Sequence, residues 1–344
     1  MQIGGFFKEL TKYAKIDKLG DPLKALNQVV DWSIFAPTLV EATLVKTPKG
    51  PGGRPPYSPI LLFKILILQR LYNLSDDQVE YQINDRLSFM RFLELDMSDK
   101  VPDAKTIWHF RETLTKAGVA DELFLVFRRH LETQGIITHS GSIVDASFVD
   151  RRKQNMSKEQ SEAVKRGEIP QEWQGEEKAK KNKLRQTDLD ARVGVKYHTR
   201  HIGYKMHNKV DADSKCVVDV VVTPANVADA KVIGELVNET DKVVYADKGY
   251  YGKKVAEQLP DTVKNEIHER ANRNHPLSAE AKERNRHRSG TRALVEHVFG
   301  TMKYNMKCGV LRCVGAMRAK MQILLLCLTY NMKRLAFLKQ CEQC

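Results

Sequence analysis

Long hydrophobic runs are missing from this sequence of 344 residues. The most apolar stretches, residues 60–71 and 323–328, are shorter than the roughly 20 residues that a membrane-spanning helix needs. The first eight residues do not combine a basic start with a long apolar core, as a secretory signal would. We therefore expect buried helices at both stretches, no membrane partner and a cytoplasmic location.

Cysteine motifs and phosphate-binding loops are also scarce. The six cysteines show no paired CxxC motifs with histidines at zinc-finger spacing. One CxxC, formed by Cys341 and Cys344, closes the sequence without a second ligand pair, so we expect reduced thiols that bind no metal. No GxxxxGK[ST] loop is present, and nucleotide hydrolysis is therefore not expected.

Basic residues, by contrast, are abundant. Lys and Arg number 56 against 43 Asp and Glu, which gives a formal net charge of +13 and a pI of about 9.3. This charge favours a nucleic acid as partner, because neutralising phosphates releases their counterions. With 42% hydrophobic residues, the chain can bury a core and is long enough for two domains.

The first third of the sequence is typical of short helices. Residues 1–56 are expected to form an arm and a linker rich in Gly and Pro. Pro59 suits the first turn of a helix, and Ser75 suits the cap of a second helix whose body covers residues 79–92. We predict a helical DNA-binding domain over residues 57–135; the alternative is that these helices simply pack together.

From about residue 141 the pattern changes to short runs of strand-forming residues. Strands are expected at residues 142–149, 204–210, 216–223 and 242–246, and a helix at residues 229–237. This order predicts an α/β (mixed α+β) fold, with a mixed five-stranded sheet flanked by helices. The catalytic domain is expected to span residues 136–335, and residues 336–344 form a tail.

Two charged stretches interrupt this domain. Residues 151–200 are poor in apolar residues, so we expect an exposed, mobile insertion that cannot bury enough surface to order itself. Its basic residues either contact DNA along its length or are simply exposed to solvent. Residues 268–292 are strongly basic and precede Glu296, which favours contact with phosphates.

Two aspartates follow short apolar runs. Asp145 comes after Ile143 and Val144, and Asp247 ends a strand ahead of Gly249, which permits a sharp turn. A carboxylate at such a position lies at the rim of a sheet. Taken singly, each is more often a turn residue or a helix cap than a metal ligand.

Glu296 has a more informative spacing. On a helix that turns about 100° per residue, Arg292, Glu296 and Lys303 fall within roughly 40° of one another. The adjacent face carries an apolar stripe, made of Val295, Phe299, Met302 and Met306. The alternative is an ordinary i, i+4 surface pair of Arg292 and Glu296.

Three carboxylates brought together by folding would suit Mg²⁺, which prefers hard oxygen ligands. Two such ions about 4 Å apart can activate a water or a 3′-hydroxyl and stabilise the leaving oxygen of a phosphodiester. A nearby Arg or Lys neutralises phosphate charge without competing for the metal. The pattern predicts metal-dependent phosphoryl transfer, with Mn²⁺ able to replace Mg²⁺.

Five sequence blocks carry a resemblance to a known family. They are Ile143-Val-Asp-Ala-Ser, Gly203-Tyr-Lys-Met-His, Val222-Thr-Pro-Ala-Asn-Val-Ala-Asp, Ala246-Asp-Lys-Gly-Tyr and Arg292-x3-Glu296-x6-Lys303. In this order they resemble the DDE transposases of bacterial insertion sequences, family five. Upstream motifs such as Pro55-Pro-Tyr-Ser-Pro extend the likeness to roughly residues 50–335.

The resemblance implies a ribonuclease H-like domain in which Asp145, Asp247 and Glu296 are catalytic and bind Mg²⁺. It implies binding of double-stranded DNA at terminal inverted repeats, cutting at the element ends, and joining of the 3′-hydroxyl ends to target DNA. A homodimer or higher synaptic oligomer, associated with the bacterial nucleoid, is expected. The DNA contacts expected near the site are Arg292, Lys303, Lys248, Arg288 and Arg286.

One position departs from the family pattern. Related transposases often carry a tyrosine three residues before the motif arginine, and Ser289 stands there in this sequence. A tyrosine-mediated DNA contact is therefore not expected. Two alternatives stay open: a domesticated or inactive relative that only binds DNA, and a related nuclease that cuts without strand transfer. The presence of all three acids favours an active transposase.

Overall fold

The computed structural model describes residues 12–44, 56–271 and 276–342. Most of the predicted linker, and Cys344, lie outside these residues. The chain divides into two compact units: a helical unit, Met1–Phe127 with Leu328–Cys344, and a sheet unit, Arg128–Cys327. None of the described helices has the length and apolar character that crossing a membrane requires.

The helical unit consists of short helices around an aromatic core. Its helices are α2 (Pro22–Val29), η1 (Trp32–Phe35), α3 (Ala36–Thr43), α4 (Pro59–Tyr72), α5 (Asp76–Asp85), α6 (Leu87–Leu93), α7 (Ala104–Ala117), the start of α8 (Ala120–Thr133) and the end of α15 (Ala316–Cys341). Trp32, Phe35 and Phe63 pack together with ring centroids 4.9–6.5 Å apart. The segment expected to be an arm therefore supplies core helices.

Local signals explain where these helices begin and end. Ser75 caps α5 as predicted, because its hydroxyl accepts a hydrogen bond from the Gln78 backbone N–H, 3.2 Å away. Pro59 opens α4, also as predicted. The helix predicted over residues 79–92 is wrong in one respect: Arg86 has an extended backbone, so α5 and α6 are separate.

The sheet unit contains seven strands, two more than expected. They are β1 (Ser142–Arg151), β2 (Arg192–Lys196), β3 (Thr199–Asp211), β4 (Val217–Pro224), β5 (Val243–Ala246), β6 (Lys264–Asn265) and β7 (Val310–Leu311). Antiparallel β3 covers one edge of β1, while parallel β5 and β7 pair with opposite ends of its other edge. β3 also pairs with β2 and β4, and β6 pairs with β5. The predicted mixed α/β fold is confirmed.

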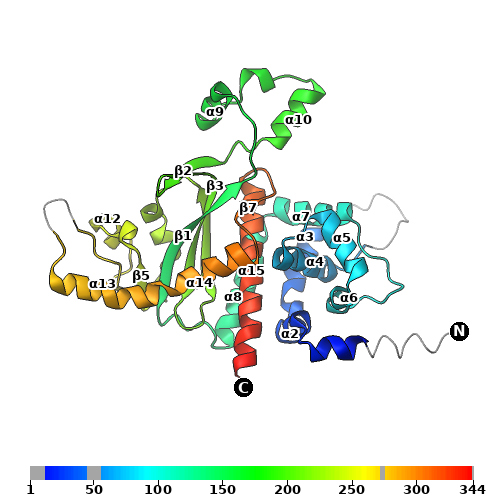
Figure 1. Cartoon of the computed structure of the whole chain (residues 1–344), viewed down its shortest axis with the longest axis horizontal. Helices are drawn as coiled ribbons and strands as arrows, with labels where there is room; N and C mark the ends of the chain where they lie inside the picture. Colours follow the sequence, from blue (N-terminus) through cyan, green and yellow to red (C-terminus); the bar gives the residue numbers. More distant parts are fainter. Residues whose placement is uncertain (1–11, 45–55, 272–275, 343–344) are drawn as a thin grey trace. The chain divides into compact units, whose positions relative to one another are not determined.

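Helices flank this sheet. The later ones are η3 (Asp229–Lys231), α11 (Ile233–Leu236), η4 (Lys248–Tyr250), α12 (Lys253–Ala256), α13 (Ala279–Arg292) and α14 (Leu294–Gly300), followed by a π-helical turn, η5 (Thr301–Asn305). α13 and α14 run along β5 and β1 (Figure 1). The single helix expected through residues 292–303 is therefore divided, although its predicted apolar stripe is buried: Val295, Phe299, Met302 and Met306.

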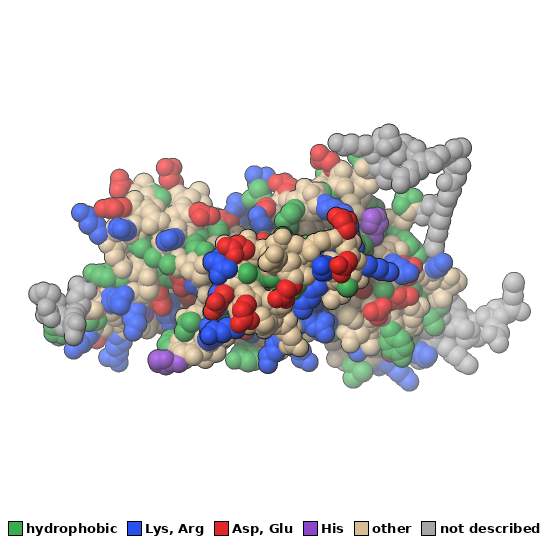
Figure 2. Space-filling view, turned by 90° about the horizontal axis from the view of Figure 1, so that it is seen from above, with side chains coloured by type: hydrophobic (Ala, Val, Ile, Leu, Met, Phe, Trp, Pro, Cys, Tyr) green, Lys and Arg blue, Asp and Glu red, His purple; other side chains and the backbone are tan. Residues whose placement is uncertain are grey.

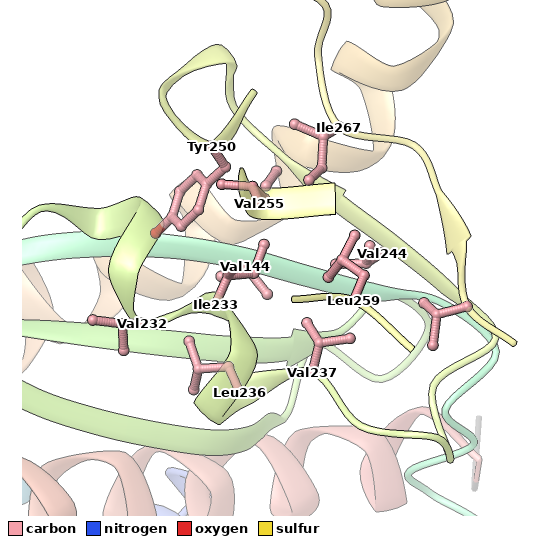
Figure 3. Packing of buried hydrophobic residues seen from close by; sticks show 12 residues of the cluster. Val144, Val232, Ile233, Leu236, Val237, Val244, Tyr250, Val255, Leu259 and Ile267 are labelled. Atoms are coloured by element: carbon pink, nitrogen blue, oxygen red, sulfur yellow. The ribbon is translucent and has the colours of Figure 1, made fainter. Parts of the chain in front are cut away.

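An apolar cluster covers one face of the sheet. It joins Val144 of β1 and Val244 of β5 to Ile233, Leu236 and Tyr250 (Figure 3). Because side chains alternate along a strand, the residue after Val144 points to the opposite face. The cluster thereby fixes the direction in which β1 presents its next side chain.

The charged insertion is more ordered than its composition indicated. It forms α9 (Lys158–Lys165), η2 (Gln171–Trp173) and α10 (Lys178–Gln186), which Figure 1 shows beyond the ends of β2 and β3. Val164 and Trp173 are buried, and Lys183 Nζ lies 5.5 Å from the centroid of the Trp173 ring. The expectation that residues 151–200 cannot order themselves is wrong, because a few apolar residues suffice for this small core.

Candidate active site

Asp145 and Asp247 are placed by the register of two parallel strands. Ser142 pairs with Val244 and Val144 with Ala246, so the next position along each strand holds an aspartate. Neighbouring strands lie about 4.8 Å apart, which brings the two backbones close at this point. Residues far apart in the sequence thus meet where β5 ends beside the middle of β1.

A tight turn fixes the side chain of Asp247. Its Oδ1 accepts a hydrogen bond from the Gly249 backbone N–H at 2.8 Å, which caps the short helix η4. A Cβ atom at Gly249 would lie only 2.8 Å from the same oxygen. Glycine at this position therefore allows the cap to form.

Arg292 connects the third acid to β1. One guanidinium nitrogen lies 3.6 Å from Asp145 Oδ2, and the other donates to Glu296 Oε1 at 2.8 Å. The i, i+4 pair considered from the sequence does form, but it also reaches the strand. The structure thus brings Asp145, Asp247, Arg292 and Glu296 into one neighbourhood.

The electrostatic environment of Asp145 is unusual. The pKa of its carboxyl is raised from 3.8 to about 6, chiefly by burial and also by the negative charge of Asp247. The Ala146 backbone N–H, which donates to Asp145 Oδ1 at 2.8 Å, lowers the pKa, as do the charges of Lys196 and Arg292. The positive charges near Asp145 therefore do not fully offset the cost of burying its ionised carboxylate.

These donors fit a divalent cation. Two neighbouring carboxylates, one of them largely buried and short of positive charge, are hard oxygen donors of the kind that Mg²⁺ takes. Within the residues described, no three His, Cys, Asp or Glu side chains gather closely enough to hold a metal. Glu296, which is paired with Arg292 and 63% exposed, therefore does not form a three-carboxylate group with the two aspartates in this arrangement.

Two lysines share the surroundings of Asp145. Lys303 is half-buried on η5, and burial together with the charge of Lys196 lowers its pKa, against the effect of Asp150 and Asp145. Lys196 is exposed at the end of β2 and acts electrostatically on both Asp145 and Lys303. Its place at the site was missed, because in sequence it belongs to the charged insertion.

The other predicted DNA contacts differ in their surroundings. Lys248 is exposed beside Asp247, and Arg286 is exposed on α13 with Glu283 3.8 Å away. Arg288 is largely buried and pairs with Glu266 at 2.6 Å and with Glu269 at 3.2 Å. Its charge is already neutralised, whereas those of Lys248 and Arg286 face solvent. Basic and acidic side chains are interspersed over the face shown in Figure 2.

Tyr250 and His268 also border the site, and both were missed as site residues. The Tyr250 hydroxyl is buried without a hydrogen-bond partner among the described residues, and burial with three nearby aspartates raises its pKa well above 10. The pKa of His268 is lowered by burial and by Arg292 and Arg288, while Asp247 opposes this shift. Tyr250 ends the Ala246-Asp-Lys-Gly-Tyr block, three residues after Asp247, and that block could have revealed it, whereas no motif in the sequence singles out His268.

Two family models match the chain. Residues 136–332 match the family described as transposase DDE domain, and residues 11–113 match the one described as transposase domain (DUF772). A solved structure, the cryo-EM structure of the piggyBac transposase synaptic complex with hairpin DNA, shares 13% identity at a TM-score of 0.46. That match covers 94% of this chain and 76% of the other. Because the DDE match spans more than half of the chain, this protein belongs to the transposase DDE domain family.

Proposed function

We propose that this DNA transposase binds the terminal inverted repeats of an insertion sequence, cuts the DNA at the element ends and joins the 3′-hydroxyl ends to target DNA. The register that sets Asp145 beside Asp247, with Glu296 joined to Asp145 through Arg292, is the observation that supports it. We further propose that the helices of residues 57–135 bind the repeats, and that a homodimer or higher oligomer brings two ends together.

Asp145, Asp247 and Glu296 are the proposed ligands of Mg²⁺, with Mn²⁺ as a substitute. When bound, such ions supply activation of the attacking oxygen and stabilisation of the leaving oxygen in phosphodiester chemistry. Asp145 lies within β1 and Asp247 directly after β5, and their carboxylates must be ionised to act as ligands. Glu296 joins them when Arg292 releases it.

The basic residues have the complementary task of holding DNA. Arg292 is placed to exchange its carboxylate partners for a backbone phosphate, since its planar guanidinium suits both. Lys303, Lys248 and the additional Lys196 border the carboxylates and would neutralise phosphates near the reacting bond. Arg286 is proposed as an outer contact, and Arg288 contributes only if it leaves its glutamates.

The function is tested with purified protein, Mg²⁺ or Mn²⁺, labelled DNA carrying the candidate terminal repeats, and a target plasmid. The variants Asp145→Asn, Asp247→Asn and Glu296→Gln are expected to abolish cutting while they keep binding to the ends. Asp261→Asn, an exposed acid of the same unit, serves as the control and should cut like the parent protein.

Nicked and joined products are scored separately, because the outcomes distinguish the proposed activities. Metal-dependent cutting that persists in any of the three variants contradicts the assignment of the acids. Cutting without joined product identifies a nuclease, and end binding without cutting by the parent protein identifies an inactive relative.

A further inference from the structure

A strongly basic pocket lies at the base of the insertion, away from the three acids. It has a volume of about 550 Å³ and is bordered by the end of β1, the end of α10 and the segment after β7. Half of the residues that line it are basic: Arg151, Arg152, Lys153, Lys183, Arg185 and Arg312. No Asp or Glu is among its lining residues in the described chain. We call it the basic pocket.

Hydrogen bonds between the two ends of the insertion hold this pocket in shape. Gln154 Nε2 donates to the Gln186 carbonyl at 2.5 Å, and Lys183 Nζ donates to the Asn155 carbonyl at 3.2 Å. Pairing of β7 with the end of β1 fixes the third wall, which carries Arg312. The basic side chains therefore converge on a framework that exists before any ligand binds.

The charges of the basic pocket are only partly balanced by the protein. Asp188 acts electrostatically on Arg151, but its carboxylate is buried and accepts a hydrogen bond from the Tyr204 hydroxyl at 2.9 Å. Arg152, Lys153, Arg185 and Arg312 are exposed. Several cations that face one space repel one another unless an anion separates them, which favours a ligand of high negative charge.

The position of the basic pocket relates it to the acids. Arg151 and Asp145 lie on the same strand, six residues apart, which corresponds to about 20 Å at the usual rise of a strand. One strand of a DNA duplex advances about 3.4 Å per nucleotide along the helix axis, so this distance equals about six nucleotides. A free phosphate or nucleotide would not need a site at such a distance from the acids, whereas a continuous DNA strand would.

We propose that the basic pocket binds the DNA backbone about six nucleotides from the phosphodiester that reacts at Asp145. This inference rests on the proposed function, because it takes the three acids as the cutting site. Under this proposal, the basic residues at the base of the insertion contact DNA phosphates, and the basic residues on α9 do not.

The test compares two double variants that each remove one Lys and one Arg from the insertion. Arg152→Gln with Lys153→Gln alters the basic pocket, and Lys165→Gln with Arg166→Gln alters exposed residues outside it. Binding is measured by fluorescence anisotropy over a salt series, without divalent metal. A short duplex extends about 3 nucleotides beyond the cutting position and a long duplex about 12, so that they bracket the proposed distance of about six nucleotides. Each extension is tested on one side of the cutting position and then on the other.

On the long duplex, the pocket variant should bind several-fold more weakly and lower the slope of log K against log salt by about 2, one unit for each lost phosphate contact. The control variant should match the parent, and on the short duplex all three proteins should bind alike. Arg185→Gln with Arg312→Gln changes the other two walls and should repeat the pattern. Inorganic phosphate at millimolar concentration should not remove the difference in affinity between parent and pocket variant on the long duplex.

Equal affinities of pocket variant, control and parent on the long duplexes overturn the proposal. A loss that is equally large on the short duplex also does so, because it places these charges near the reacting bond. Since the assay measures binding alone, a protein that shows the expected pattern but never cuts DNA refutes the proposed function and not the pocket. A protein that cuts DNA but binds it equally well after the pocket substitutions refutes the pocket and not the proposed function.

Discussion

At the scale of single residues, Arg292 is a cation that contacts two of the three acids. It lies against Asp145 on the strand and Glu296 on the helix, and so occupies oxygens that the proposed metal ion would take. Both of its partners are needed for the proposed chemistry. One side chain therefore links the two acids and, under the proposed chemistry, must leave them before both can bind a metal.

Replacing Arg292 should make the carboxylates better ligands. In the DNA-free protein at about pH 8, Arg292→Gln is expected to bind Mn²⁺ several-fold more tightly than the parent, as measured by calorimetry or by the EPR signal of free Mn²⁺. Arg286→Gln removes an equal charge from an exposed position on α13 and should leave the affinity unchanged. Weaker binding by Arg292→Gln would show that the arginine assembles the site instead of competing for it.

The raised pKa of Asp145 predicts a pH-dependent stability. Its pKa is about 6 in the folded protein against 3.8 ordinarily, so its stabilising contribution is complete below pH 3.8 and lost as pH rises through about 6. Asp145→Asn should therefore be more stable than the parent by about 1–3 kcal/mol at about pH 7.5, and this advantage should vanish below about pH 4. Denaturant unfolding in EDTA across this range measures it; a variant less stable than the parent at the upper end of the range contradicts the prediction.

At the scale of elements, a buried ion pair holds the strands that carry the aspartates. Lys209 of β3 lies 3.0 Å from Asp241, which precedes β5, and both side chains are fully buried. The Ser142 hydroxyl, at the start of β1, donates to the other oxygen of Asp241 at 2.6 Å. This one carboxylate therefore ties three strands together at the end opposite the active site.

Breaking that pair should destabilise the sheet unit. Lys209→Met leaves Asp241 buried without its cation and is expected to lower the free energy of unfolding by about 3–5 kcal/mol. Adding Asp241→Asn to the same variant should recover part of this loss, because the unpaired charge is then gone. Urea unfolding of both proteins measures the difference. A double variant no more stable than the single one would show that packing, and not charge, dominates at this place.

The helices and strands that could be predicted are those whose formation depends on residues close to one another in the sequence. The cap at Ser75 and the strands that lead to Asp145 and Asp247 depend on neighbouring residues, and they form as expected. The proximity of Lys196 to Asp145 depends on β2 pairing with β3, a contact across the sheet that no spacing encodes. Tertiary packing likewise decided that Trp173 would order the insertion.

At the scale of the whole molecule, the excess of basic residues coexists with many acidic ones. The formal net charge is +13, yet Lys and Arg side chains stand among Asp and Glu on the face shown in Figure 2. Several basic residues, such as Arg288 and Lys209, are already paired inside the fold. Net charge therefore promotes the approach to DNA, while a smaller number of unpaired cations determines where DNA lies.

DNA binding by the full chain should consequently depend steeply on salt. The logarithm of the binding constant is expected to fall linearly with the logarithm of salt concentration, by about 0.9 for each phosphate contacted. Terminal-repeat and unrelated duplexes of equal length should show similar slopes but different intercepts, because the bases and not the phosphates specify sequence. A slope near zero on both duplexes would contradict phosphate-based binding.

The π-helical turn after α14 makes the number of residues between Glu296 and Lys303 as important as their identity. Met306 donates its backbone N–H to the Thr301 carbonyl, five residues back, and such a turn amounts to one residue inserted into an α-helix. Lys303 lies inside this turn, where each residue advances less around the axis than in an α-helix, so its direction relative to Glu296 differs from the one that ordinary α-helical spacing gives. An interval between aligned letters alone therefore does not establish an equivalent site.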